Sequence, residues 1–253
     1  MSEVAKISVR RAGVTFRSED RETKVLENFD LEVREGELVC VLGPSGCGKS
    51  TLLNLIAGFL QPTTGAVLID DQPVRGPDPR RIFVFQERGL FPWLTVEENV
   101  AFGLARLSKP ERAQRVAHYI ELVGLVGFAK AYPSELSGGM KQRVEVARAL
   151  AVNPDVLFLD EPFGALDSIT RMGMRRELLR IWGAEKKTIL FVTHDIDESV
   201  QLADRIVVMG ARGSTGVHGI VAVDIAHPRE LSSPRYLEIR DGILEAIGLA
   251  HGI

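Results

Sequence analysis

Cysteine is scarce in this sequence, since Cys40 and Cys47 are the only cysteines among 253 residues. Two thiols are too few for a disulfide scaffold or a structural zinc site, so we expect reduced thiols in a reducing compartment. The first residues lack the apolar run of a signal peptide, and no uninterrupted apolar stretch reaches the roughly 20 residues that a bilayer-spanning helix needs. Any role at a membrane is therefore expected to come through a partner.

The sequence also lacks an excess of positive charge. It holds 31 Lys and Arg residues against 34 Asp and Glu residues, a formal net charge of -3. Nucleic-acid binding depends on a concentrated basic face, so this balance argues against nucleic acid as a partner. With 45% hydrophobic and 26% charged residues, the composition is that of a globular protein with a core to bury.

Short apolar runs predict an α/β core with a mostly parallel sheet. Four runs are apolar on both faces, as parallel strands covered by helices are: residues 38–42, 82–85, 156–159 and 189–192. A smaller antiparallel sheet is predicted near the N-terminus from residues 7–9, 28–33 and 66–69, because residues 28–33 alternate between polar and apolar side chains. A further strand-like run covers 219–225.

Helix signals concentrate between the second and third apolar runs. Thr95 with Glu98, and Ser108 with Glu111, have the spacing of capping boxes. The pair Ser233-Pro234 predicts a last helix through Ile247. We therefore expect one domain over 1–253, with a core and β subdomain in 1–89 and 154–225, a helical subdomain in 90–153 and a short tail in 226–253.

A phosphate-binding loop follows the first buried run. Residues 43–51, GPSGCGKST, fit the pattern G-x-x-x-x-G-K-[ST]. Glycines let backbone N–H groups curl around phosphate oxygens at a helix start, Lys49 would reach the terminal phosphates, and the Ser50 hydroxyl would bind Mg²⁺. A plain glycine-rich turn is the alternative, which the strand before and the helix after disfavour. The predicted nucleotide-binding residues here are Gly43, Pro44, Ser45, Gly46, Cys47, Gly48, Lys49, Ser50 and Thr51.

The thiol of Cys47 lies beside this predicted helix start. Because the positive end of a helix dipole favours a thiolate, we predict that Cys47 is more reactive than Cys40.

Two carboxylates end the third apolar run. Strand alternation would direct Asp160 and Glu161 to opposite sides, Asp160 toward Mg²⁺ and Glu161 toward an attacking water. A solvated strand end is the alternative interpretation of these acids. Gln86 and His194 follow two other runs, at the carboxyl ends of strands where ligands collect in open α/β sheets. Taken alone, Gln86 could be a strand-end cap and His194 a structural histidine.

The stretch Leu136 to Arg143, LSGGMKQR, resembles the signature motif of ATP-binding cassette (ABC) ATPases. The order of phosphate loop, Gln86, signature, Glu161 and His194, with GALD at 164–167 before His194, matches that family. The resemblance implies the ABC ATPase fold of P-loop NTPases, an α/β fold with a mostly parallel core sheet, an N-terminal antiparallel β subdomain and a helical subdomain. Ser137 could also be a plain helix N-cap.

The resemblance implies ATP hydrolysis with Mg²⁺ in a head-to-tail homodimer bridged by ATP. It assigns catalysis to Gln86, Glu161 and His194, and Mg²⁺ to Ser50, Gln86 and Asp160. The partner subunit would offer Ser137, Gly138 and Gly139 to the γ-phosphate. Asp167 would couple the two sites at the subunit boundary. Phe16 is the candidate for the aromatic that stacks on adenine, with a core position at a strand edge as the alternative.

The apolar stretch 89–94, GLFPWL, is either core or a docking surface. In ABC transporters this region docks a coupling helix of a membrane subunit, so permease subunits are expected to dock near Gln86–Trp93. The stretches QERGLFPWLTVEENVAFGL and THDIDESVQLADRIVVM resemble ATPase subunits of the nitrate/sulfonate/taurine importer group.

This resemblance implies separate membrane permeases, a periplasmic or extracellular substrate-binding protein, and a peripheral place on the cytoplasmic face of the membrane. Two other functions stay open at this point. One is a soluble ABC ATPase that acts as a nucleotide-driven clamp. The other is a plain P-loop kinase or switch, which leaves LSGGMKQR and His194 without a role.

Overall fold

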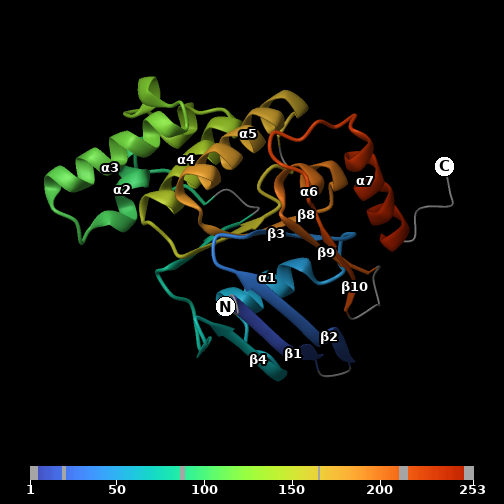
Figure 1. Ribbon diagram of the computed structural model, residues 1–253. Coiled ribbons are helices and arrows are strands. Elements are labelled where there is room, and N and C mark those ends of the chain that lie inside the picture. The colour runs from blue at the N-terminus through green and yellow to red at the C-terminus, as the bar shows by residue number, and fades with distance from the viewer. Residues whose placement is uncertain (1–4, 19–20, 86–88, 165, 211–215, 248–253) are drawn as a thin grey trace. The chain divides into compact units, whose positions relative to one another are not determined.

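The first and the last segments that the structure describes belong to the same structural unit. The computed structural model describes residues 5–18, 21–85, 89–164, 166–210 and 216–247 (Figure 1). Unit 1 comprises residues 1–78 and 186–253, and unit 2 comprises residues 79–185. Unit 2 contains the segment 90–153 together with the strands and the helix on either side of it. The finer division drawn from the sequence stays a prediction.

Strands of alternating burial form the antiparallel sheet of unit 1. Its order is β2-β1-β4-β5, with β1 at Ala5–Ser18, β2 at Arg21–Arg34, β4 at Thr64–Ile69 and β5 at Gln72–Pro73. Phe29, Leu31 and Val33 are buried while their neighbours in β2 are exposed, as the alternation predicted. The β1–β2 pair is longer than the predicted runs, since pairing continues on both sides of each register shift from Ala5 to Ser18.

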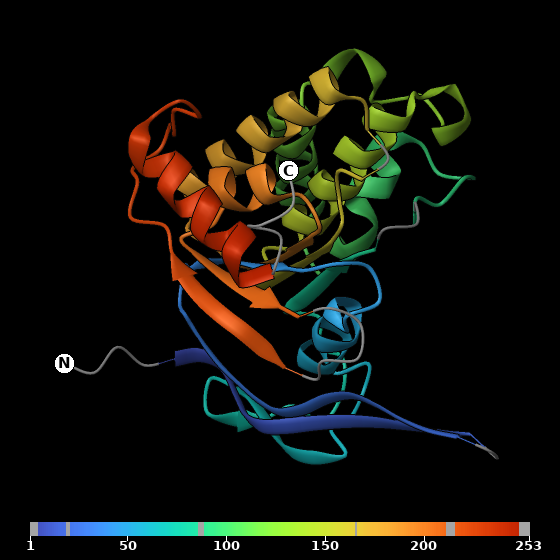
Figure 2. The ribbon, with the colours of Figure 1, turned by 90° about the vertical axis from the view of Figure 1, so that its right-hand side faces the viewer.

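The second sheet of unit 1 has the order β10-β9-β3-β8. Its strands are β3 (Leu38–Leu42), β8 (Thr188–Thr193), β9 (Arg205–Met209) and β10 (Val217–Ala222). β3 pairs in parallel with β8 and with β9, whereas β10 is antiparallel to β9. Helices α1 (Lys49–Ala57), α6 (Ile196–Leu202) and α7 (Pro234–Ile247) pack on these strands (Figure 2). Every residue of β3 and β8 is buried, which confirms the prediction from their apolar runs.

Two details at the end of this sheet differ from the prediction. The strand predicted at 219–225 is shifted, because β10 ends at Ala222 and Val223 N donates instead to Asp204 O at 2.8 Å. Strand β9 was not predicted, although Ile206 to Met209 are all buried. The predicted last helix is confirmed, and the Ser233 hydroxyl accepts from Tyr236 N at 3.4 Å at its start.

Unit 2 combines two parallel strands with a group of helices. β6 (Arg81–Val84) and β7 (Val156–Asp160) pair in parallel, so a mostly parallel core is confirmed. Helices α2 (Val96–Ala101), α3 (Lys109–Leu122) and α4 (Gly138–Ala151) contact one another, and α5 spans Ser168–Glu185. Short 3₁₀ turns occupy Phe102–Leu104, Val126–Phe128 and Pro133–Glu135.

Both predicted capping boxes are present in unit 2. Glu98 Oε2 accepts from Thr95 N at 2.8 Å, and Glu111 Oε2 accepts from Ser108 N at 3.1 Å. These hydrogen bonds to the charged form lower the pKa of both glutamates. In the parts of the chain that the structure describes, no helix has the length and apolar character needed to span a membrane.

Candidate functional site

The predicted phosphate loop connects β3 to α1 in unit 1. Gly46 and Gly48 have φ angles of 80° and 103°, a region that L side chains rarely adopt, so the loop requires glycine there. Lys49 is only 5% exposed, and its Nζ donates to Gly43 O at 2.8 Å and to Pro44 O at 3.0 Å. The loop therefore curls around the ammonium group and surrounds a buried positive charge with backbone.

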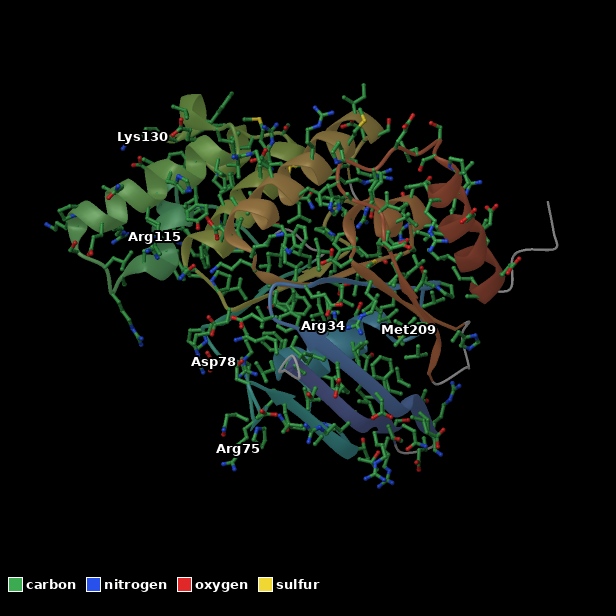
Figure 3. All side chains as sticks on the ribbon, in the orientation of Figure 1. Arg34, Arg75, Asp78, Arg115, Lys130 and Met209 are labelled. Atoms are coloured by element: carbon green, nitrogen blue, oxygen red, sulfur yellow. The ribbon has the colours of Figure 1, made fainter. Side chains whose placement is uncertain are left out.

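Gly43 leaves no room for a side chain at the start of this loop. A Cβ on Gly43 would lie 2.8 Å from Cys47 Sγ and 2.9 Å from the carbonyl oxygen of Met209, the last residue of β9 (labelled in Figure 3). Ser45, Gly46 and Ser50 are exposed. The tight side of the loop thus faces the strands, and its open side faces solvent.

Burial of Cys47 overturns the reason given for its reactivity, namely that the helix start favours the thiolate. Cys47 is 4% exposed, and burial raises the pKa of its thiol, although the nearby Lys49 charge acts in the opposite direction. Desolvation therefore outweighs the helix start. Burial raises the pKa of Cys40 well above its ordinary value. That Cys47 is the more reactive of the two thiols stays a prediction.

Alkylation of single-cysteine variants checks this assignment. In Cys40→Ala protein we expect Cys47 to react with iodoacetamide more slowly than a free thiol at neutral pH. Because its pKa is raised, the rate should keep increasing with pH at values above the pKa of an ordinary thiol. We expect Cys40 in Cys47→Ala protein to react more slowly still, and ATP to protect Cys47. Mass spectrometry gives the rates. Labelling of Cys47 at the rate of a free thiol, or with no protection by ATP, would contradict its burial in the nucleotide loop.

His194 follows β8, beside the phosphate loop. β3 pairs with β8, and Leu42 lies opposite Thr193 at the carboxyl ends of the two strands. The phosphate loop and His194 therefore follow adjacent strand ends. The His194 side chain is exposed.

The residues next to His194 form a ring of hydrogen bonds that the sequence reasoning missed. The Thr193 hydroxyl donates to Glu198 Oε2 at 2.7 Å and accepts from Asp195 N at 3.0 Å. Asp195 Oδ1 in turn accepts from Glu198 N at 3.0 Å. The spacing D-x-x-E at 195–198, typical of a helix start, was the available signal. The ring fixes the backbone on both sides of His194.

Phe16 lies in β1, opposite Thr23. Its side chain is 47% exposed, which excludes a core position. About half of the residue is therefore accessible to solvent, and its role toward adenine stays a prediction.

The two predicted acids of unit 2 differ in backbone conformation. Asp160 ends β7 and is 9% exposed. Glu161 has a φ of 44°, in the left-handed region, so it is not part of the strand. The argument from strand alternation is therefore wrong at Glu161. Gly164 N donates to Glu161 O at 3.1 Å, and a Cβ on Gly164 would lie 3.7 Å from Glu161 Oε2, so the carboxylate lies over the following turn.

The signature stretch opens α4 in unit 2. Ser137 is its N-cap, with Oγ accepting from Met140 N at 3.3 Å, which confirms the capping interpretation. Its side chain is exposed, so the capping role leaves it accessible to a ligand. Asp167 is also exposed, and its Oδ1 accepts from Ile169 N at 3.1 Å at the start of α5. The predicted site residue Gln86 and Ala165 of the GALD stretch lie outside the described residues.

An apolar groove in unit 2 adjoins the predicted docking segment. Phe85, Trp93 and Phe102 are 52%, 69% and 58% exposed, so the core interpretation of the segment is wrong at Trp93. The groove is a cavity of about 430 Å³ bounded by β6, α4 and the Phe102–Leu104 turn. Trp93 lies beside it, with its ring centre 5.6 Å from that of Phe91, which lines the cavity. Exposed aromatic side chains around a cavity are typical of a protein-binding surface.

Buried polar residues, which the sequence reasoning missed, support this groove. Asn99 is 0% exposed; its Nδ2 donates to Phe91 O and Leu94 O, and its Oδ1 accepts from Phe91 N at 2.9 Å. Glu145, 5% exposed, accepts from Gly89 N at 2.6 Å. The Arg148 guanidinium lies 5.2 Å from the centre of the Phe91 ring. The sign of these contacts in the sequence is that Asn99 and Glu145 are polar residues at buried positions of α2 and α4.

Comparison with known proteins gives consistent matches. The sequence profile of the family described as "ABC transporter" matches residues 26–164. The aliphatic sulfonates import ATP-binding protein of Bacillus cereus is 45% identical over 239 residues, 94% of each chain. The nitrate import ATP-binding protein of Synechococcus elongatus is 45% identical over 241 residues, 92% of this chain and 88% of that protein.

Two solved structures resemble the fold. A dimeric ATP-binding cassette in a post-hydrolysis state, bound to ADP and phosphate, has a TM-score of 0.76 and 34% identity, covering 87% of this chain and 100% of the other. A protein of Clostridium perfringens, described as part of an ABC transporter complex, has a TM-score of 0.77 and 28% identity, covering 87% and 89%.

Proposed function

The chain belongs to the ABC transporter family, and from this membership we propose that it is the ATP-hydrolysing subunit of an importer for small oxyanions such as sulfonates or nitrate. The observation that carries the ATPase activity is the phosphate loop, whose positive-φ glycines and buried Lys49 fit a nucleotide phosphate. The two import proteins that are 45% identical to this chain support the class of cargo.

Recovery of the assembled transporter tests this function and its cargo. The tagged chain should co-purify with membrane subunits, whose identification leads to the substrate-binding protein of the same system. Titration of that binding protein with an alkanesulfonate, taurine and nitrate should give saturable binding of one of these anions. If the chain co-purifies with no membrane subunit yet hydrolyses ATP on its own, a soluble nucleotide-driven clamp would be favoured instead.

We infer the roles of the nucleotide-binding residues from their chemistry. Lys49 supplies a positive charge to the phosphates, and the N–H groups of the loop donate to phosphate oxygens. Mg²⁺ usually takes one or two carboxylates together with substrate phosphates, and the Ser50 hydroxyl, Asp160 and Gln86 are the proposed ligands here. When bound, this ion neutralises charge that develops on the phosphates. Phe16 is proposed to stack on adenine.

Hydrolysis requires a base for the attacking water and groups that sense the γ-phosphate. We propose Glu161 as the base, which accepts the proton of the water, with Gln86 and His194 positioning the water and the phosphate. The exposed side chain of His194, at the same sheet edge as the phosphate loop, supports its assignment.

The homodimer is proposed to be head-to-tail, so that each ATP contacts both subunits. The exposed Ser137 and the following Gly138 and Gly139, at the start of α4, would bind the γ-phosphate held by the partner's Lys49. Asp167 would connect the two sites at the boundary. The dimeric, ADP-bound cassette that resembles this chain supports the arrangement.

The apolar groove of unit 2 is proposed to receive a short helix of the membrane permease, near Gln86–Trp93. Its exposed aromatic side chains offer contact area, and Arg148, whose pKa burial lowers, lies against Phe91 at the groove. This docking would hold the chain peripherally at the cytoplasmic face of the membrane and connect cargo release by a binding protein outside to ATP turnover inside.

Substitution of the exposed aromatics tests the groove. Trp93→Ser and Phe102→Ser should each weaken permease binding by about 2 kcal/mol, roughly 30-fold in Kd, because aromatic anchors dominate such interfaces. Co-purification of the complex measures the loss, and ATP turnover of the isolated subunit should not change. Phe59→Ser is the matched control, since Phe59 is 52% exposed but belongs to unit 1, whereas the groove lies in unit 2. Equal losses in all three variants would contradict the assignment.

A further inference from the structure

Side chains from the C-terminal part of unit 1 form hydrogen bonds with both ends of α6, the helix that follows His194. α6 begins at Ile196, two residues after His194, and α7 packs against it (Figure 2). We call residues 223–247 the C-terminal strap. A helix of seven residues is too short to be stable alone, so its position depends on what packs against it.

The last turn of α6 is held by Arg229. Arg229 Nη1 donates to Val200 O at 2.6 Å and to Ala203 O at 2.7 Å. Carbonyls at a helix end have no partner within the helix, and a cation complements the negative end of its dipole. Arg229 Nε also donates to Ile225 O at 2.8 Å, so one guanidinium joins the strap to α6. His227 adds a contact from Nε2 to Gln201 O at 3.1 Å.

The first turn of α6 is held by Tyr236. Its hydroxyl donates to Asp197 Oδ1 at 2.9 Å, and its side chain is 1% exposed. Asp197 lies between Asp195 and Glu198, the two acids whose hydrogen bonds with Thr193 surround His194. A shift of α6 would therefore break the ring that fixes the backbone of His194.

We propose that Arg229 and Tyr236 are positioning residues for His194, so that the C-terminal strap sets the rate of ATP hydrolysis without contacting ATP. This inference rests on the proposed role of His194 in hydrolysis. Arg229 and Tyr236 bind α6 through the hydrogen bonds described above, whereas Lys49 Nζ donates to carbonyl groups of the phosphate loop itself. ATP affinity should therefore be insensitive to the strap, and turnover should be sensitive to it.

Kinetics of the full chain test the inference. Arg229→Ala should lower kcat roughly 10- to 100-fold, the scale expected when a reacting group is misplaced. Tyr236→Phe, which keeps the ring, should give a smaller loss, and Arg229→Lys should recover part of the activity. KM and the Kd of a fluorescent ATP analogue should stay within about twofold of the original values.

Arg235→Ala is the matched control on the same segment. Arg235 is exposed, and its Nε donates to Asp224 Oδ1 at 3.0 Å rather than to α6. Its kcat should not change. Melting temperatures are measured for every variant, and assays are run well below them. A folded Arg229→Ala or Tyr236→Phe protein with unchanged kcat would overturn the inference. If Arg229→Ala does not fold, Tyr236→Phe decides in the same way.

A double-mutant cycle separates this inference from the proposed function. In a His194→Ala background, Arg229→Ala should cause no further loss of kcat, because both changes remove the same contribution. Losses that add independently would overturn the positioning role alone. Normal turnover of His194→Ala would refute the proposed role of His194, and the inference with it.

Discussion

Glu161→Gln protein should bind ATP normally yet hydrolyse it about 10²- to 10⁴-fold more slowly, the loss typical when a general base is removed. The amide keeps the size of the side chain but cannot accept the proton of the attacking water. Because Glu161 has a left-handed backbone directly after β7, glutamine can take the same place without a change in strand pairing. Steady-state phosphate release and binding of a fluorescent ATP analogue measure the two properties separately.

Glu27→Gln is a matched control for this change. Glu27 is exposed on β2 and pairs with Lys24 at 3.1 Å, so its turnover should equal that of the unmodified chain. Normal hydrolysis by Glu161→Gln would remove Glu161 from the proposed role of base. Loss of ATP binding together with hydrolysis would assign it to the nucleotide contact instead.

Ser137→Arg protein should bind ATP as a monomer and fail to hydrolyse it, with turnover at least roughly 10²-fold lower, the cost of losing a donor to the transition state. A long cation at the start of α4 blocks the approach of the partner's phosphates, while the phosphate loop lies in the other structural unit. Phosphate release and sedimentation with ATP report the two effects.

Two further variants separate blocking from loss of the helix cap. Ser137→Ala removes the hydroxyl that accepts from Met140 N, which should cost about 1 kcal/mol of stability, with a smaller effect on turnover than arginine. Ser232→Arg adds the same charge at another exposed serine and should change neither property. Ser137→Arg protein with normal turnover would place the signature outside the site.

The sequence allowed good predictions where a feature is local. β3 was expected at its observed bounds because its five buried residues form one apolar run, and both capping boxes depend only on residues three apart. The phosphate loop was recognised for the same reason, since its glycines and Lys49 are adjacent in the chain.

Features that depend on distant residues could not be predicted. The burial that raises the pKa of Cys47 comes from tertiary packing, and Met209 approaches Gly43 of the same loop from a strand far along the chain. The left-handed turn at Glu161 contradicts the alternation of the preceding strand. Arg229 acts on carbonyls 26 and 29 residues earlier, and its place in the sequence gives no sign of this contact.

The central claim is that ATP bound to one subunit is completed by the signature of another. Sedimentation of Glu161→Gln protein with ATP and Mg²⁺, with and without the additional Ser137→Arg change, tests it most directly. We predict the mass of a dimer for the single variant and the mass of a monomer for the double variant, although both bind ATP. A dimer of the double variant, or a monomer of the single variant at saturating ATP, would contradict the claim.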